Sequence, residues 1–313
     1  MEAKPLNLQA ALYIKAAKKL GIKYQIIHPA GLVRFYKNHK TTRIYKSQVE
    51  ANNAVATLLA RNKYHTNRLL KKAKLPVAKL SFCRSLEEAL KATTAIGFPV
   101  VVKPTKGSRG HLTTLDITNA RELKTAVNDI KTVNQTFLVE KFHQGNDYRF
   151  LVLDNTVIGI VKLKVPTITG DGKQTVRELT RALPRVKIDT EVRKLLQKQE
   201  QTLSSVLPKG KVIPIRQNAN YSTGGTSETL QKNQVNPAIL RLAVKAAKTM
   251  RITLAGIDML LRDPKKTPEG NAVIIEVNSK PSLFIHHHPD RGTPQPVAET
   301  ILRHLLHLKG KRV

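Results

Sequence analysis

The sequence predicts a globular protein of mixed α/β (α+β) class, and three observations support this prediction. Its 313 residues are enough for two or three packed lobes of about 100 to 150 residues each. Hydrophobic residues make up 41% of the chain and no tract repeats, which excludes fibrous and wholly disordered classes. Stretches with helical and with strand-like spacing of apolar residues alternate along the chain.

The opening part of the chain predicts a small lobe of helix and strand. Apolar residues first recur at helical spacing and then alternate as in a strand. The last helix here must stop before Pro76, because the residue before a proline disfavours the helical region. The expected elements are a helix at 6–20, a strand at 23–28, and helices at 51–60 and 63–74.

The middle of the chain predicts the order strand, loop, strand, helix, strand. An apolar run from Pro99 ends at Lys103, and a glycine-containing loop follows it. Asn119 is placed to cap a helix that runs to about Lys131. The apolar run 137–142 is the next expected strand.

The remaining segments predict a hairpin, three helices and two final strands. Asp154-Asn155 joins two β-rich runs, as in a hairpin turn, and Asn236-Pro237 is typical of a helix start. The expected elements are strands at 148–154 and 156–165, helices at 174–183, 190–203 and 236–250, and strands at 254–261 and 272–278. We divide the chain into lobes at 1–62, 63–143 and 144–313.

Composition limits the partners and the compartment. The chain has 54 Lys and Arg against 22 Asp and Glu, a formal net charge of +32, which attracts polyanions. Aromatic residues reach only 4%, which argues against nucleic acid as the main partner. A single cysteine, Cys83, excludes an intrachain disulfide framework. With no apolar stretch long enough to span a bilayer, a cytoplasmic location is expected.

Oxygen-donor side chains gather on the last two expected strands. Asp258 lies within one apolar strand, and Glu276 and Asn278 stand two apart on the next, so they share a face. Such hard oxygen donors suit Mg²⁺. The alternative is that each carboxylate is only hydrogen-bonded at a strand end.

Two loops have the composition of ligand-binding segments. Lys103 ends a strand ahead of Gly107 and Gly110, an arrangement that can hold phosphate oxygens, although no Walker-type loop is present. The segment 218–226 combines small residues with amides and hydroxyls. Each loop could equally be an ordinary turn or solvated loop.

Seven short motifs in a fixed order resemble those of the ATP-grasp ligases. The likeness is greatest to the ATP-grasp part of cyanophycin synthetase and of bifunctional glutathione synthetase, over roughly residues 62 to 305. The motifs are Lys103-Pro104, Leu138-Val-Glu140, Asp147-Tyr-Arg149, Gly170-Asp-Gly172, Asn220-Tyr-Ser-Thr-Gly-Gly225, Gly256-Ile-Asp258 and Glu276-Val-Asn278. This resemblance implies an ATP-grasp fold, in which two α/β lobes clasp ATP behind a small N-terminal lobe.

The resemblance also implies roles for single residues. Lys63 and Lys103 would hold ATP phosphates, under a loop that includes Gly107, Ser108 and Gly110. The remaining implied roles are an adenine hinge at Glu140, Lys141 and Phe142, a ribose carboxylate at Asp147, magnesium ligands at Asp258, Glu276 and Asn278, and substrate or phosphate contacts at Arg149, Lys164, Arg216 and Asn220. Ser108 and Leu112 stand where the family often has asparagine and a third glycine, and Asn62 where it often has aspartate.

The implied activity is ATP-dependent joining of a carboxylate to an amine through an acyl phosphate. The implied cofactors are ATP and two Mg²⁺ ions, which Mn²⁺ could replace. An amino acid or acidic peptide is the expected substrate, and a homo-oligomer is left open. Two alternatives are a catalytically idle ATP-binding regulatory protein and a basic nucleic-acid-binding protein.

Overall fold

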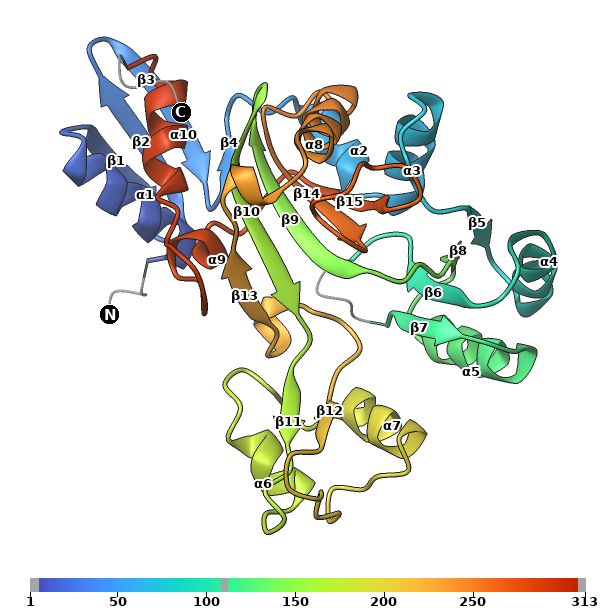
Figure 1. The fold of residues 1–313 in the computed structure, drawn as a ribbon. Coiled ribbons are helices and arrows are strands. Elements are labelled where there is room, and N and C mark those ends of the chain that lie inside the picture. The colour runs from blue at the N-terminus through green and yellow to red at the C-terminus, as the bar shows by residue number, and fades with distance from the viewer. Residues whose placement is uncertain (1–5, 108–111, 309–313) are drawn as a thin grey trace.

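A five-stranded antiparallel sheet forms the centre of the computed structural model, which describes residues 6–107 and 112–308 (Figure 1). Its strand order is β13-β10-β9-β14-β15. These strands are β9 (Asn146–Leu153), β10 (Thr156–Lys164), β13 (Thr226–Thr229), β14 (Leu254–Leu261) and β15 (Ala272–Asn278). The bounds of β14 and β15 agree with those expected from the sequence, and Asp154 has the positive φ of 52° that a tight hairpin turn needs.

The two faces of this sheet bury different sets of side chains, because successive residues of a strand point to opposite faces. One face carries Phe150 and Ile257 and packs against three helices, α2 (Ala54–Ala60), α3 (Lys63–Lys72) and α8 (Pro237–Thr249). The other face carries Leu151, Leu153 and Leu254, which pack against the N-terminal lobe and the C-terminal helix. Further along the strands, this second face carries the ionic residues of the candidate site.

The N-terminal lobe is a four-stranded antiparallel sheet that shares its core with the C-terminal end of the chain. Val33, Phe35 and Ile44 of its inner face are buried with helices from both ends, which lie beside the sheet in Figure 1. The sequence indicated only its first strand. The elements are α1 (Leu8–Lys19), β1 (Lys23–His28), β2 (Leu32–Lys37), β3 (Lys40–Tyr45), β4 (Gln48–Val49), α9 (Phe284–His287) and α10 (Val297–Leu305).

A second four-stranded antiparallel sheet, of order β5-β8-β6-β7, forms a lobe beside the central sheet. The Asn119 side chain caps its second helix as expected, by accepting the N–H of Glu122 at 2.9 Å. Its first helix and first strand were not anticipated. The elements are β5 (Leu80–Cys83), α4 (Leu86–Ile96), β6 (Val100–Pro104), β7 (Thr114–Ile117), α5 (Ala120–Lys131) and β8 (Phe137–Lys141).

A small lobe with its own core extends from the ends of β10 and β13 (Figure 1). Ile168, Val176 and Ile213 are buried in it. Its second helix ends at Lys198, earlier than the expected 203. The elements in and near it are β11 (Thr167–Thr169), α6 (Val176–Arg181), α7 (Thr190–Lys198), β12 (Val212–Pro214), and the 3₁₀ turns η1 (Tyr221–Thr223) and η2 (Lys232–Gln234).

The lobe bounds proposed from the sequence, 1–62, 63–143 and 144–313, stay a prediction. The helix α3, which opens the proposed second lobe, packs against the central sheet and not against the β5-β8-β6-β7 sheet. Within the described residues, no helix is both long and apolar enough to cross a membrane.

Asn52 joins the N-terminal lobe to the central sheet by side-chain hydrogen bonds. Its buried amide accepts the N–H of Leu254 at 2.9 Å and donates to the carbonyls of Leu254 at 3.1 Å and Ser279 at 3.3 Å. These bonds hold the start of β14 and the end of β15 against the chain that leads into α2.

We expect Asn52→Ala to lower the free energy of unfolding by about 2–4 kcal/mol, because it leaves buried backbone groups unsatisfied at about 1–3 kcal/mol each. Urea denaturation measures the change. Asn233→Ala, at an exposed position, is the matched control and should change stability by less than about 0.5 kcal/mol. Equal stability of the two variants would contradict this account of Asn52.

Candidate active site

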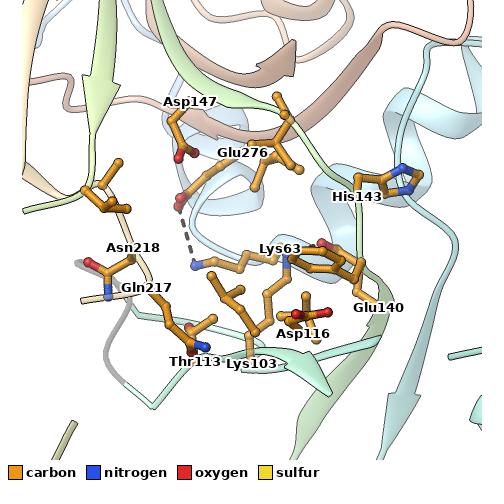
Figure 2. Close-up of a pocket in the computed structure, with 18 of the residues that line it drawn as sticks. Lys63, Lys103, Thr113, Asp116, Glu140, His143, Asp147, Gln217, Asn218 and Glu276 are labelled. Carbon is orange, nitrogen blue, oxygen red and sulfur yellow. Dashed lines mark hydrogen bonds and ion pairs between the residues drawn. The ribbon is translucent and has the colours of Figure 1, made fainter. Parts of the chain in front are cut away.

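A cavity of about 550 Å³ lies between the central sheet and the β5-β8-β6-β7 sheet. Figure 2 shows Asp147 and Glu276 on one side of it, Lys103 and Asp116 on the other, and Lys63 between them. Many residues singled out in the sequence line it. They are Lys63, Lys103, Gly107, Glu140, Lys141, Phe142, Asp147, Arg216 and Glu276.

The pairing of three central strands places the acidic residues together. Asp258 on β14 lies directly opposite Glu276 on β15 and directly opposite Arg149 on β9. A β-bulge at this point makes Ile275 an extra residue on β15, and both Ile275 and Glu276 line the cavity. Strand register, set by residues far apart in sequence, therefore brings the two carboxylates side by side.

Asp258 is held by two neighbours. Arg149 donates to both of its carboxylate oxygens, with an Nη2–Oδ2 distance of 2.8 Å. The Asn278 amide donates to Asp258 Oδ2 at 2.9 Å. Burial works to lower the pKa of Arg149, but Asp258 more than offsets it and the pKa is raised, so the guanidinium stays charged.

Lys63 bridges the central sheet and the loop that follows β6. Its Nζ donates to the carbonyl of Gly107 at 2.9 Å and lies 3.5 Å from Glu276 Oε1 (Figure 2). The side chain is fixed at the start of α3, where Asn62 Oδ1 accepts the N–H groups of Tyr64 and His65. Asn62 thus supplies the helix cap that an aspartate would supply at the same position.

A second lysine is paired inside the neighbouring sheet. Lys103 Nζ lies 2.8 Å from both carboxylate oxygens of Glu140, and both residues are buried. They are diagonal neighbours on β6 and β8, because Val101 is opposite Glu140 and Lys103 is opposite Leu138. Removing either partner would leave an uncompensated buried charge.

Comparisons with known proteins show the family of this chain. A model of the RimK-like ATP-grasp domain matches residues 60–207 and 214–289 of this chain. The chain belongs to the RimK-like ATP-grasp family. It is 29% identical over 309 residues to the cyanophycin synthetase of Trichormus variabilis, covering 92% of this chain and 34% of that protein.

Two further proteins are similar to this ATP-grasp chain. The glutathione biosynthesis bifunctional protein GshAB of Streptococcus mutans is 30% identical over 275 residues, covering 81% of this chain and 36% of that protein. The crystal structure of a bifunctional glutathione synthetase from Pasteurella multocida has a TM-score of 0.68 at 21% identity, covering 96% of this chain and 44% of that one. This structure supports the fold, and the chain spans about a third of the length of the sequence relatives.

Four residues singled out in the ATP-grasp resemblance have other partners in the structure. Arg216 is buried and bonded through Nη1 to Glu191 and through Nη2 to Asp189, both at 2.6 Å. Lys164 pairs with Glu228 at 2.7 Å at the surface, and the Asn220 side chain caps η1. Lys141 points its Nζ at the carbonyls of Gly97 and Phe98.

The backbone of the two residues after Glu140 is hydrogen-bonded within its own lobe. The N–H groups of Lys141 and Phe142 donate to the carbonyls of Lys79 and Pro99 within the lobe, at 2.8 and 3.1 Å. Ser108 and Gly110 lie outside the described residues. Arg149, Asp258 and Asn278 adjoin Glu276 without lining the cavity themselves.

Some cavity residues were not identified from the sequence as site residues. They are Thr113, Asp116, His143 and Gln217, and Asn218 was noted only as part of a polar loop (Figure 2). His143 has a buried Nε2 without a hydrogen-bond partner among the described residues, and burial lowers its pKa. Its position directly after the hinge motif was the available signal. No sequence feature indicated Asp116, since it lies on a short strand with no motif.

The segment that contains His286, Pro289 and Gly292 packs against β10 and β13 and lines no part of this cavity. His286 is fully buried, with Nδ1 3.0 Å from Gln295 Oε1, and burial lowers its pKa to about 4. Gly292 has a φ of 85°, and a Cβ there would lie 2.4 Å from Thr229 Oγ1. These residues therefore hold the C-terminal segment against β10 and β13.

Two ion pairs connect the small lobe to helix α5 of the lobe that contains the β5-β8-β6-β7 sheet. Lys194 on α7 lies 2.5 Å from Asp129 on α5, and Lys198 lies 3.7 Å from Glu122. All four side chains are at least one-third exposed, so each pair contributes little by itself.

The pKa of the Asp147 carboxyl group is raised by its surroundings in the cavity. Burial first, and then the charge of Asp258, raises its pKa to about 6, against the opposing effect of Arg149. At pH 3, below both the ordinary pKa of an aspartate and the raised pKa, the folded and the unfolded chain both hold this proton. As the pH rises to about 6 the unfolded chain ionises first, so folding loses stability, by about 3 kcal/mol when the change is complete.

We therefore expect Asp147→Asn to stabilise the protein by up to about 3 kcal/mol at pH 7.5 and to leave stability at pH 3 nearly unchanged. Urea unfolding at both pH values measures this. Asp171→Asn is the control, because backbone N–H groups lower the pKa of that exposed carboxyl. A gain of stability for Asp171→Asn, or none for Asp147→Asn, would show that burial does not govern Asp147.

Proposed function

We propose that this protein is an ATP-dependent carboxylate–amine ligase that forms an amide bond through an acyl phosphate. One observation carries the proposal: in an ATP-grasp chain, Asp258 and Glu276 meet across a strand pair at the cavity into which Lys63 and Lys103 project. Carboxylates for cations and lysines for phosphates are the groups that phosphoryl transfer needs.

The nucleotide would occupy the 550 Å³ cavity. Lys63 and Lys103 would bind phosphate oxygens, and Asp147 would accept hydrogen bonds from the ribose hydroxyls. Glu140, Lys141 and Phe142 would border the base. The loop that includes Gly107, Ser108 and Gly110 would cover the phosphates.

The residues beside the cavity fit a divalent cation. Asp258, Glu276 and Asn278 supply hard oxygen donors that suit Mg²⁺ and also Mn²⁺, and we propose two ions. Each carboxylate is already paired with a positive charge: Asp258 with Arg149, and Glu276 with Lys63. These positions therefore favour a cation beside the carboxylates. Such a cation would neutralise phosphate oxygens during transfer.

The proposed reaction has two steps. A carboxylate oxygen of the first substrate attacks the γ-phosphorus of ATP, the bond to the β-phosphate oxygen breaks, and ADP leaves. The second substrate's amine then attacks the acyl carbon, phosphate leaves, and the nitrogen loses a proton. Lys63 and Lys103 would oppose the charge on the transferred group.

We propose an amino acid or an acidic peptide as substrate. The similar proteins are named for cyanophycin and glutathione synthesis, and the formal charge of +32 favours acidic molecules. Arg149, Lys164, Arg216 and Asn220 would contact the carboxylate and the phosphoryl group. Because Lys164 and Arg216 are paired with acidic residues in the structure, substrate would have to compete with those acids.

The test is ADP release with Mg²⁺ across a panel of amino acids and acidic peptides. Asp258→Asn and Glu276→Gln should each reduce it by roughly a hundredfold or more, because each removes charge at the transferred phosphate. Glu87→Gln, at an exposed helix position, should retain full activity.

Thermal unfolding should confirm that each variant is folded. Undiminished ADP release by either site variant would contradict the assignment of these carboxylates. ATP binding without acceptor-dependent ADP release by the unaltered protein would instead identify a non-catalytic ATP-binding protein.

A further inference from the structure

The outer face of the N-terminal sheet is exposed and carries cations and aromatic rings. Val33, Phe35 and Ile44 point inward to the shared core, so the alternate residues of β2 and β3 point outward. Strand pairing sets Lys23 beside Tyr36, and Gln25 beside Arg34. We call this surface the tyrosine face; it consists of Lys23, Gln25, Arg34, Tyr36, Arg43 and Tyr45.

Two arginines lie directly opposite each other at its centre. Arg34 on β2 pairs in register with Arg43 on β3, and like charges in directly opposed positions destabilise a sheet. Glu50 forms an ion pair with Arg43. Within the part of the chain that the structure describes, Arg34 forms no ion pair within 4.0 Å, although, beside the hydrogen bond from Arg43, its charge also lowers the pKa of Glu50. An anionic ligand would relieve this repulsion.

Exposed tyrosines flank the arginine pair. Tyr36 is 41% exposed and Tyr45 is 39% exposed, a high value for large rings in a sheet. They sit on adjacent strands, four residues apart along the strand direction, or about 14 Å. Lys46 and Lys280 approach the Tyr45 ring, with Nζ atoms 5.3 and 5.4 Å from its centroid.

We infer that the tyrosine face binds single-stranded nucleic acid, with Tyr36 and Tyr45 stacking on bases and Arg34 and Arg43 contacting the phosphates between them. Rings interleaved with cations on an open sheet match this ligand, because every base has a face to stack on. A second copy of the chain would bring the same cations together. An acidic peptide would satisfy the arginines but would leave the rings without a stacking partner.

This inference is compatible with the low aromatic content of the whole chain. Two of the seven tyrosines lie on this one face, on either side of the arginine pair. The face belongs to the N-terminal lobe and lines no part of the nucleotide cavity, so its binding should not require ATP.

The experiment is fluorescence anisotropy of a labelled 15-nucleotide oligo-dT with the full chain, without ATP, over a range of salt concentrations. Tyr36→Ala and Tyr45→Ala should each weaken binding roughly tenfold through lost stacking, whereas Tyr36→Phe and Tyr45→Phe should retain it. Arg34→Gln should reduce the slope of log affinity against log salt by about 0.7.

Lys245→Gln, which removes one exposed charge on α8, is the matched control and should leave the slope unchanged. Thermal unfolding of each variant separates lost binding from lost folding, and the phenylalanine variants preserve the ring if the alanine variants unfold. Absent binding, equal effects of Arg34→Gln and Lys245→Gln, loss of binding in the phenylalanine variants, or tighter binding of poly-glutamate at this face would each overturn the inference.

Discussion

The candidate site depends on opposed charges held at one end of the central sheet. Asp258 lies between Arg149 on one neighbouring strand and Glu276 on the other, and Lys63 reaches Glu276 from the start of α3. Two carboxylates directly opposite each other would repel unless cations stood beside them. The positions of α3, β9, β14 and β15 thus depend partly on keeping these charges matched.

The same sheet face serves stability and chemistry at different points along its strands. Leu151, Leu153 and Leu254 bury one end of it against the N-terminal lobe, whereas Arg149 and Asp258 lie further along the same side. The apolar end fixes the register of the strands, because a slip by one residue would turn these side chains to the other face. Register in turn places the carboxylates at the cavity.

Sequence patterns predicted elements whose signals are local. The apolar runs of β14 and β15, the Asn119 cap and the Asp154-Asn155 turn each depend on neighbouring residues. The hairpin of β2 and β3 was missed, because its turn residues Asn38 and His39 are not a common turn pair although both have positive φ.

Local sequence patterns could not show which side chains distant in the sequence form ion pairs and hydrogen bonds with each other. The family resemblance implied that four residues belong to the site, and all four line one cavity. They are Lys63, Lys103, Glu140 and Glu276. Nothing local in the sequence indicates that Arg216 is bonded to Asp189 and Glu191, since these contacts require α7 to lie beside β12. The same holds for Arg149, whose partner Asp258 is 109 residues away.

A crystal structure with Mg²⁺ and a non-hydrolysable ATP analogue tests the central claim most directly. The account predicts the triphosphate between Lys63 and Lys103, with Asp258 and Glu276 on the cation and Lys63 released from Glu276 to a phosphate oxygen. A nucleotide bound in this cavity with the Lys63–Glu276 pair intact and the cation held by other residues would contradict it, as would a nucleotide bound elsewhere.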